Sequence, residues 1–186
     1  MELTDEALMR RFQHGDRSAF AALVGRHRLH ALHFCLRMLH DPDMAEDMAQ
    51  EGFARILQHP ERFTGRARFT SYLFAILKNL CIDELRWRTR WRRSQEICET
   101  DSPDPAPLPD EQVAQAERHL VHTALGQLSS DFRAALILRE FHGLPYEEIA
   151  DVMGWSESKT RVTIYRARLA LGRAYTAAGG GDADGA

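Results

Sequence analysis

The sequence of residues 141–171 is FHGLPYEEIADVMGWSESKTRVTIYRARLAL, which predicts two short helices joined by a tight turn. Pro145 suits the first position of a helix, because its fixed φ is already helical and that position needs no N–H donor. Gly154 can take the left-handed conformation that reverses the chain, and Ser156 can then cap the second helix. This order of residues predicts a helix-turn-helix.

The second of these helices has two different sides. One side carries small or branched residues at helical spacing: Thr160, Ile164, Ala167 and Leu171. The other side carries polar, cationic and aromatic residues: Ser158, Lys159, Arg161, Tyr165 and Arg168. Such a helix can pack with one face and contact DNA with the other. The alternative is an ordinary helix–glycine–helix corner with a solvated, charged face.

The composition is that of an ordinary globular protein. Of the 186 residues, 44% are hydrophobic and 27% are charged. Charged residues interrupt the apolar runs, and the N-terminus has neither the basic start nor the apolar core of a signal peptide. We therefore expect a cytoplasmic protein with no membrane insertion. No paired carboxylates, Cys/His constellation or phosphate-binding loop occurs at a usable spacing, so we expect no enzyme and no cofactor.

Cysteine and histidine give no clear metal-site pattern. The three cysteines are widely spaced and form no Cys-x-x-Cys pair: Cys35, Cys81 and Cys98. We expect these thiols to be buried and inert. Three histidines recur at every third position of one predicted helix: His27, His30 and His33. Because that helix offers them no carboxylate partner, we expect ordinary histidines and no bound metal.

Charge is segregated along the chain, although the net charge is only −3. Residues 1–93 carry 16 Lys and Arg against 12 Asp and Glu, whereas residues 94–112 carry 6 acidic residues and no Lys or Arg. The acidic segment also holds four prolines, which prevent a helix and favour an extended chain. We expect an all-α protein with two small helical domains, 1–93 and 113–174, joined by the acidic Pro-rich linker 94–112. Residues 175–186 are expected to be a disordered tail.

The N-terminal domain is expected to hold four helices and no strand, at about residues 4–14, 18–39, 43–58 and 70–93, with Asp43 capping the third. The third helix has residues suited to a core: Met44, Met48, Phe53, Ile56 and Leu57. Its polar surface is acidic and amide-bearing: Glu46, Asp47, Gln50 and Glu51. The fourth helix has its own apolar face: Leu73, Ile76, Leu77, Leu80 and Leu85.

The fourth helix ends in LRWRTRWRRS, where arginines surround two tryptophans that lie one helical turn apart: Arg86, Arg88, Arg90, Arg92 and Arg93 with Trp87 and Trp91. Arginine binds phosphate through its charge and planar fork, and tryptophan offers a flat face on which an unpaired base can stack. Further cations and aromatics precede them: Phe63, Arg66, Arg68, Phe69, Tyr72 and Phe74. For Tyr72 and Phe74, packing in the core is an equally good interpretation.

Three motifs, in order, resemble those of the extracytoplasmic-function (ECF) sigma factors, the compact initiation subunits of bacterial RNA polymerase. The resemblance covers about residues 5–173. The run DPDMAEDMAQEGFARIL resembles the family's polymerase-docking helix, and FTGRARFTSYLFAILKNLCIDELRWR resembles its promoter-melting segment. The run ALGQLSSDFRAALILREFHGLPYEEIADVMGWSESKTRVTIYRAR resembles its upstream promoter reader.

The resemblance implies a transcription initiation factor that binds core RNA polymerase and promoter DNA and is held by an anti-sigma factor. Its polymerase-binding residues would be Asp47, Gln50 and Glu51. Its minus-ten residues, which trap flipped bases and melt the duplex, would be Phe63, Arg66, Arg68, Phe69, Tyr72, Lys78, Asn79, Asp83, Arg86, Trp87 and Arg88. Its minus-thirty-five residues would be Ser156, Ser158, Lys159, Arg161 and Arg166. The acidic linker would run through the polymerase cleft.

The chain departs from the family pattern in the predicted reading helix. Thr160 stands where an apolar residue is expected, and Val162 with Thr163 replace a polar and a basic residue. Pro145 stands where a capping serine is common, and Tyr72 where tryptophan is usual. Two alternatives remain: an autonomous helix-turn-helix regulator, and a sigma-like decoy that binds an anti-sigma factor without directing transcription.

Overall fold

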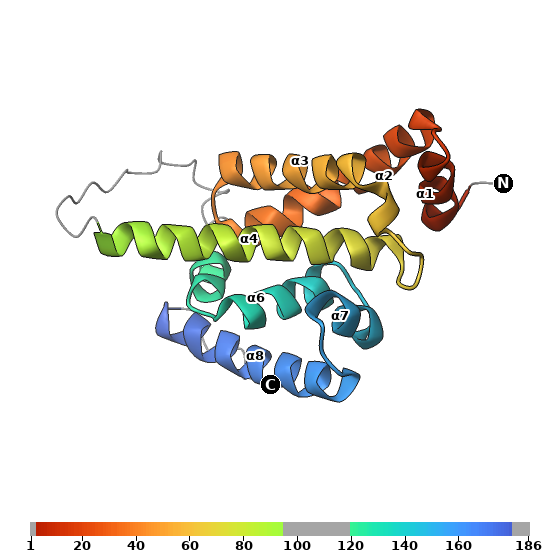
Figure 1. Cartoon of the computed structure of the whole chain (residues 1–186). Coiled ribbons are helices and arrows are strands. Elements are labelled where there is room, and N and C mark those ends of the chain that lie inside the picture. Colours follow the sequence, from red (N-terminus) through yellow and green to blue (C-terminus); the bar gives the residue numbers. More distant parts are fainter. Residues whose placement is uncertain (1–2, 95–119, 180–186) are drawn as a thin grey trace, which may run out of the picture.

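The computed structural model describes residues 3–94 and 120–179, and over these ranges the chain forms helices, turns and loops without a strand. This confirms the all-α prediction. The N-terminal half contains α1 (Asp5–Gln13), α2 (Arg17–Leu39) and α3 (Pro42–Gln58). A short helix, η1 (Pro60–Arg62), leads through a loop into the long α4 (Phe69–Ser94). Helices α2, α3 and α4 pack together, and α1 lies against one end of this group (Figure 1).

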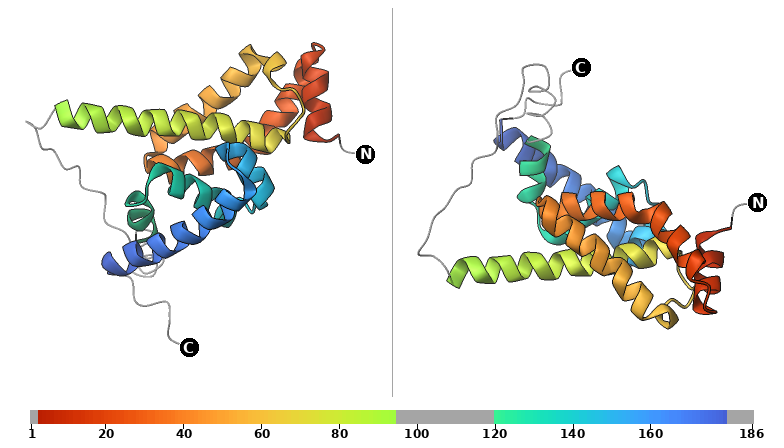
Figure 2. Two further views of the ribbon diagram at one scale, coloured as in Figure 1. Left: turned by 60° about the horizontal axis from the view of Figure 1, so that its bottom comes forward. Right: turned by 90° about the horizontal axis from the view of Figure 1, so that it is seen from above.

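The C-terminal half is a smaller helical group. Residues 120–126 are helical and precede α6 (Ser130–Leu136), which continues into the π-helical turn η2 (Ile137–Phe141). Helix α7 (Tyr146–Met153) and helix α8 (Glu157–Ala177) follow. In Figure 1 and in the left view of Figure 2, α8 lies on the side of this group that is remote from α4.

Capping residues explain where the N-terminal helices begin. The side chain of Thr4 accepts a hydrogen bond from the Ala7 N–H at 3.2 Å, and Asp41 accepts one from the Met44 N–H at 3.1 Å. The prediction that Asp43 caps α3 was wrong. Asp41 has the extended backbone of a cap and Pro42 occupies the first helical position, so Asp43 falls in the first turn.

The core of the N-terminal half follows the predicted faces with one exception. Phe53 and Ile56 of α3 are buried, as are Leu73, Leu77 and Leu80 of α4. Met44 and Met48 are half-buried and pack against this core. Leu57, also predicted to be buried, is 50% exposed, because it follows Ile56 directly and helical geometry turns it away from the face that Ile56 occupies.

The two helical groups share one continuous apolar core. Helix α7 packs on α4, while α6 and η2 contact α2. Arg133, on α6, is buried and donates a hydrogen bond to the Met38 carbonyl of α2 at 2.6 Å. The His142 ring follows η2 and lies 4.8 Å from the Phe74 ring of α4, between ring centroids.

The chain between the two groups falls largely outside the described residues. The predicted linker 94–112 begins at Ser94, which is still the last residue of α4, and the rest of it is not described. The predicted tail starts too early, because α8 continues to Ala177. Ala174 is buried and Tyr175 lines a hollow with Val121, so packing holds this end of the helix in place.

Candidate nucleic-acid interface

The turn between α7 and α8 has the geometry of a helix-turn-helix. Gly154 ends α7 with a left-handed φ of 67°, as its position in the sequence predicted. Ser156 then caps α8 by accepting a hydrogen bond from the Lys159 N–H at 3.3 Å. Pro145 immediately precedes α7 as its cap residue, one position earlier than predicted, because its ψ of 157° is extended rather than helical.

Helix α8 divides into the two faces that the sequence predicted. Thr160, Ile164 and Ala167 are buried against α6 and α7. The Thr160 hydroxyl donates a hydrogen bond to the Ser156 carbonyl at 3.0 Å. A buried hydroxyl with a partner costs little, so threonine can replace the apolar residue expected there.

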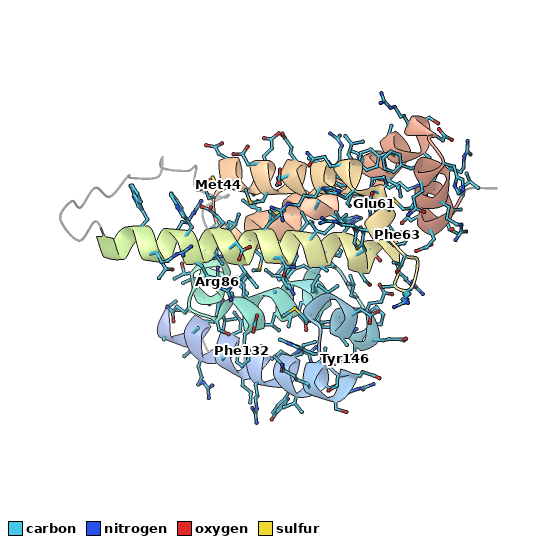
Figure 3. All side chains as sticks on the ribbon, viewed as in Figure 1. Met44, Glu61, Phe63, Arg86, Phe132 and Tyr146 are labelled. Atoms are coloured by element: carbon cyan, nitrogen blue, oxygen red, sulfur yellow. The ribbon has the colours of Figure 1, made fainter. Side chains whose placement is uncertain are left out.

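The predicted minus-thirty-five residues are all exposed, most of them at the start of α8 and the last one near its middle: Ser156, Ser158, Lys159, Arg161 and Arg166. Aromatic rings of neighbouring elements lie under two of the cations. The Lys159 ammonium is 4.6 Å from the centroid of the Trp155 ring, and the Arg161 guanidinium is 4.8 Å from that of Tyr146. Arg161 also pairs with Glu157 one turn earlier in the helix. Lys159 and Arg161 are thus exposed cations that each lie over an aromatic ring, and Tyr146, the ring beneath Arg161, is labelled in Figure 3.

A second cationic surface lies near the end of α4. Trp87 and Trp91 stack at 5.6 Å between ring centroids, with an angle of 16° between their planes, and each is 51% exposed. Arg86 is exposed beside them, whereas Arg88 is half-buried and pairs with Glu84 at 2.7 Å and Asp41 at 2.8 Å. Flat exposed rings beside cations suit unpaired bases. Arg88 is oriented by its two carboxylates and ties α4 to the start of α3.

The loop before α4 turns its aromatic and cationic residues to opposite sides. Phe63 is 5% exposed and Phe69 is fully buried, with their ring centroids 6.1 Å apart. The half-buried Tyr72 packs on Phe63 at 5.4 Å between centroids. Arg66 and Arg68 are exposed. In this arrangement the two phenylalanines hold the loop in the core, while the arginines face solvent.

Helix α7 covers part of the predicted minus-ten surface. Arg68 pairs with Glu148 of α7 at 3.2 Å, and the same carboxylate accepts hydrogen bonds from Thr70 and Ser71 at 3.4 and 3.5 Å. Lys78 donates a hydrogen bond to the Val152 carbonyl at 3.1 Å, and burial lowers the pKa of this ammonium. The structure therefore places these two predicted minus-ten cations against the helix-turn-helix.

The remaining predicted residues are on open surface. Asn79 and Asp83 are exposed on α4, and Asp83 lies 3.6 Å from Arg86. On α3, Asp47 and Gln50 are exposed. Glu51 is half-exposed and pairs with Arg55 at 2.9 Å. The three predicted polymerase-binding residues thus share the polar side of α3, away from the apolar core.

The cysteines are buried where the structure describes them. Cys35 and Cys81 are free thiols in the core, and Cys98 lies outside the described ranges. A hydrogen bond with Cys35, followed by burial, raises the pKa of the Cys81 thiol, so the Cys81 thiol is a poor nucleophile. His27 has a carboxylate partner that its own helix lacks, because Asp5 of α1 lies 2.7 Å from its Nε2. Within residues 3–94 and 120–179, no group of three metal-ligating side chains is suitably placed.

The sequence did not predict the residues that make contacts with partners far away along the chain. Glu148, Gln13 and Glu6 each contact the loop before α4 or the first residues of that helix. Nothing in their local pattern distinguishes them from ordinary polar residues on a helix surface. Their partners are between 47 and 80 positions away, so only the fold brings the groups together.

Comparison with known proteins agrees with this geometry. Residues 23–93 match the family described as Sigma-70 region 2, and residues 118–171 match Sigma-70, region 4. The RNA polymerase sigma-H factor of Pseudomonas aeruginosa is 35% identical over 184 aligned positions, which cover 91% of this chain and 93% of the relative. The ECF RNA polymerase sigma-E factor of Haemophilus influenzae is 30% identical and covers 90% and 93%.

A solved structure of CnrH in complex with the cytosolic domain of CnrY is similar over most of the chain. It has a TM-score of 0.70 and 25% sequence identity, and the match covers 93% of this chain and 97% of that one. None of the helices in the described parts of the chain has the length and apolar character needed to span a membrane. The two family matches in order, and relatives that cover nearly the whole chain, show that it belongs to the ECF family of sigma-70 RNA polymerase sigma factors.

Proposed function

We propose that this sigma factor docks on core RNA polymerase through the polar side of α3 and opens promoter DNA with α4 and the loop before it. Helix α8 would enter the major groove of the minus-thirty-five element. The observation that carries the proposal is the pair of exposed cationic surfaces, one on each helical group. The acidic linker would lie between these groups in the polymerase cleft. Its site of action would be the cytoplasm, where RNA polymerase transcribes.

The minus-ten surface would act by binding rather than by covalent chemistry. Separating the strands costs a few kcal/mol of stacking for each base that is extruded. The stacked rings of Trp87 and Trp91 can return part of that free energy, because stacking on an aromatic side chain is worth about 1–3 kcal/mol per base. Arg86, Arg66 and Arg68 would hold the phosphates of the separated strand. No reacting group is needed.

On the minus-thirty-five surface, some residues would contact bases and others would contact the phosphate backbone. The first residues of a recognition helix face base edges, which places Ser158, Lys159 and Arg161 toward the groove. Arg166 lies further along the exposed side and would contact the backbone. Ser156 would keep the start of the helix in register through its cap.

We further propose that an anti-sigma protein controls this chain. CnrH, which resembles it over most of its length, has been solved in complex with the cytosolic domain of CnrY. The packing of α7 on α4 supports such control, because Arg68 and Lys78 would have to give up their contacts with α7 to bind DNA. A partner that held the two helical groups together would keep Arg68 paired with Glu148 and Lys78 bonded to the Val152 carbonyl.

A reconstituted transcription assay tests the proposal. Core RNA polymerase and this protein are mixed with a promoter library, and transcript starts are read by sequencing. We expect starts at a fixed distance from a shared pair of elements, absent when either protein is omitted. Starts that do not depend on this chain would contradict the proposal. Tight specific DNA binding without polymerase would instead favour an autonomous regulator, and binding to an anti-sigma protein with no transcription would favour a decoy.

A further inference from the structure

Helix α1 makes hydrogen bonds to the α3–α4 loop, residues 59–68, and to the first residue of α4. The loop contains η1 and the two exposed arginines, Arg66 and Arg68. Helix α1 lies beside η1 and the start of α4. It also lies outside residues 23–93, the part that matches the Sigma-70 region 2 family. The polar side chains of α1 belong to neither of the two cationic surfaces described above.

Gln13, the last residue of α1, joins the two ends of η1. Its Nε2 donates one hydrogen bond to the Pro60 carbonyl and another to the Phe63 carbonyl, each at 2.8 Å. A single amide group thus uses both of its N–H bonds on backbone carbonyls that are three residues apart. The path of the chain into the loop is fixed at this point.

Glu6 fixes the other end of the same loop. Its Oε1 accepts a hydrogen bond from the N–H of Phe69, the first residue of α4, at 3.1 Å. This N–H has no partner within the helix, and a carboxylate at a helix N-terminus also interacts favourably with the helix dipole. Helix α1 therefore supplies the cap of α4 across 63 positions of sequence.

A third contact keeps α1 in position for both tasks. Asp5 accepts a hydrogen bond from Arg26 at 2.8 Å and lies 2.7 Å from His27 Nε2. The His27 ring in turn packs on the Phe69 ring, with 5.3 Å between centroids. Asp5 thus links the start of α1 to α2, and the His27 ring links α2 to the start of α4.

The part of the loop between these anchors encloses a small hollow. The hollow measures about 190 Å³, and its lining includes Phe63, Gly65 and Arg66 of the loop, Tyr72 of α4 and Asp151 of α7. Gly65 has a φ of 73°, so the loop bends sharply where glycine is favoured. The shape of the hollow depends on where the loop enters and leaves, which Gln13 and Glu6 determine.

We propose that Gln13 and Glu6 are positioning residues for the minus-ten element: they fix both ends of the α3–α4 loop, so that its hollow and arginines are shaped before DNA arrives. This inference rests on the proposed function of the loop. Neither residue needs to touch DNA. Pre-forming the loop would remove its ordering cost from the binding of an extruded base, so loss of an anchor would weaken capture.

The test compares four variants in complete holoenzyme: Gln13→Ala, Glu6→Ala, Glu6→Gln and the control Gln58→Ala. Gln58 is an exposed glutamine near the end of α3. Opening is followed by the fluorescence of 2-aminopurine placed in the minus-ten element. Affinity for core polymerase and the thermal midpoint of the free chain are measured alongside.

We expect Gln13→Ala and Glu6→Ala to weaken opening about tenfold, the size expected for losing one or two hydrogen bonds. Core affinity should stay unchanged in both variants. The thermal midpoint should move little in Gln13→Ala, because the Gln13 side chain is exposed. Glu6→Gln should open nearly as well as the unaltered chain, since its amide oxygen can still accept from Phe69. Gln58→Ala should behave as the unaltered chain.

Two results would overturn the inference. One is wild-type opening in both alanine variants. The other is a loss of opening matched by an equal loss of core affinity or of the folded state, which would make the contacts purely structural. If the unaltered holoenzyme itself fails to open the promoter, the proposed function fails instead, so the two failures are distinguishable.

Discussion

Gly52 lets α3 approach α4 closely. A Cβ atom built at this position would lie 2.5 Å from Cδ2 of Leu77, whereas one built at Gly25 of α2 would meet nothing within 4 Å. Leu77 is fully buried and has little room to move. We expect Gly52→Ala to lower the free energy of unfolding by about 1–3 kcal/mol, as overpacked cores do, despite alanine's better helix propensity.

Gly25→Ala is the matched control, because it adds the same methyl group in a helix with open space around it. We expect this variant to raise the free energy of unfolding by about 0.4–1 kcal/mol. Urea denaturation of both variants measures the difference. Equal effects of the two substitutions would show that the α3–α4 crossing is looser than the structure indicates.

Thr160 illustrates what a residue pattern can and cannot decide. Its place on the packing face of α8 was predictable from helical spacing with Ile164 and Ala167. The sequence did not predict that the core would accommodate its buried hydroxyl, since that depends on the hydrogen bond from the hydroxyl to the Ser156 carbonyl. In the same way, Phe63 and Phe69 could be identified as loop aromatics, but only the three-dimensional packing shows that both rings point inward.

Helix α8 gives a test of how the upstream element is recognised. Arg161 is in its second turn, on the exposed side, and Arg173 is an exposed arginine near its other end. We expect Arg161→Ala to reduce discrimination at one minus-thirty-five position by about 1–3 kcal/mol, because residues near the start of a recognition helix contact base edges.

The comparison uses promoter libraries randomised at the minus-thirty-five element, transcribed by holoenzyme with each variant. Arg173→Ala should leave the preferred sequence unchanged. A uniform loss across all promoters with Arg161→Ala would mean that this arginine contacts phosphate instead of a base. The sequence alone could not separate these outcomes, because base-edge and phosphate contacts use the same side chain.

Element boundaries were largely predictable, whereas contacts between elements were not. Caps and helical spacing placed α1, α2 and α4 within a residue or two of their observed ends. These signals are local, and so they survive without knowledge of the fold. The packing of α7 on α4 depends on Glu148 reaching Arg68, 80 positions earlier, which no local pattern contains.

In this structure the two helical groups pack together in a closed form, and Glu148 joins them. Replacing Glu148 by Ala removes the partner of Arg68, Thr70 and Ser71 together. We expect this variant to shift the chain toward an open form, about fivefold in population, because one partly buried ion pair with hydrogen bonds is worth about 1 kcal/mol. Energy transfer between fluorophores on α3 and α8 reports the change.

Glu147→Ala is the control for that measurement, since Glu147 is the exposed neighbour on the same helix turn. It should leave the energy transfer unchanged. Equal effects of both substitutions would attribute opening to the loss of negative charge on α7 and not to the contacts of Glu148.

Two histidines make closure depend on pH. Burial lowers the pKa of His40 to about 4, and the charges of His122 and Arg133 add to the shift. Burial likewise lowers the pKa of His142 to about 4, with His30, Arg37 and His33 contributing. The Nε2 atoms of His40 and His142 are buried and have no hydrogen-bond partner among the described residues, so a proton there would be poorly accommodated.

The direction of the pH effect follows from these shifts. His142 packs on Phe34 and Phe74 of the other helical group, and His40 stacks on His122 at 3.7 Å between centroids, so separation of the groups would expose both rings. In the open form their pKa returns toward 6.5, so the open form binds more protons. Closure should therefore be fully stable above about pH 6.5 and lose stability progressively as the pH falls toward 4.

Energy transfer between α3 and α8, measured from pH 7.5 to 5, should fall in the unaltered chain and stay flatter in a His40→Gln, His142→Gln double variant. An equally steep fall in both chains would assign the pH dependence to other groups.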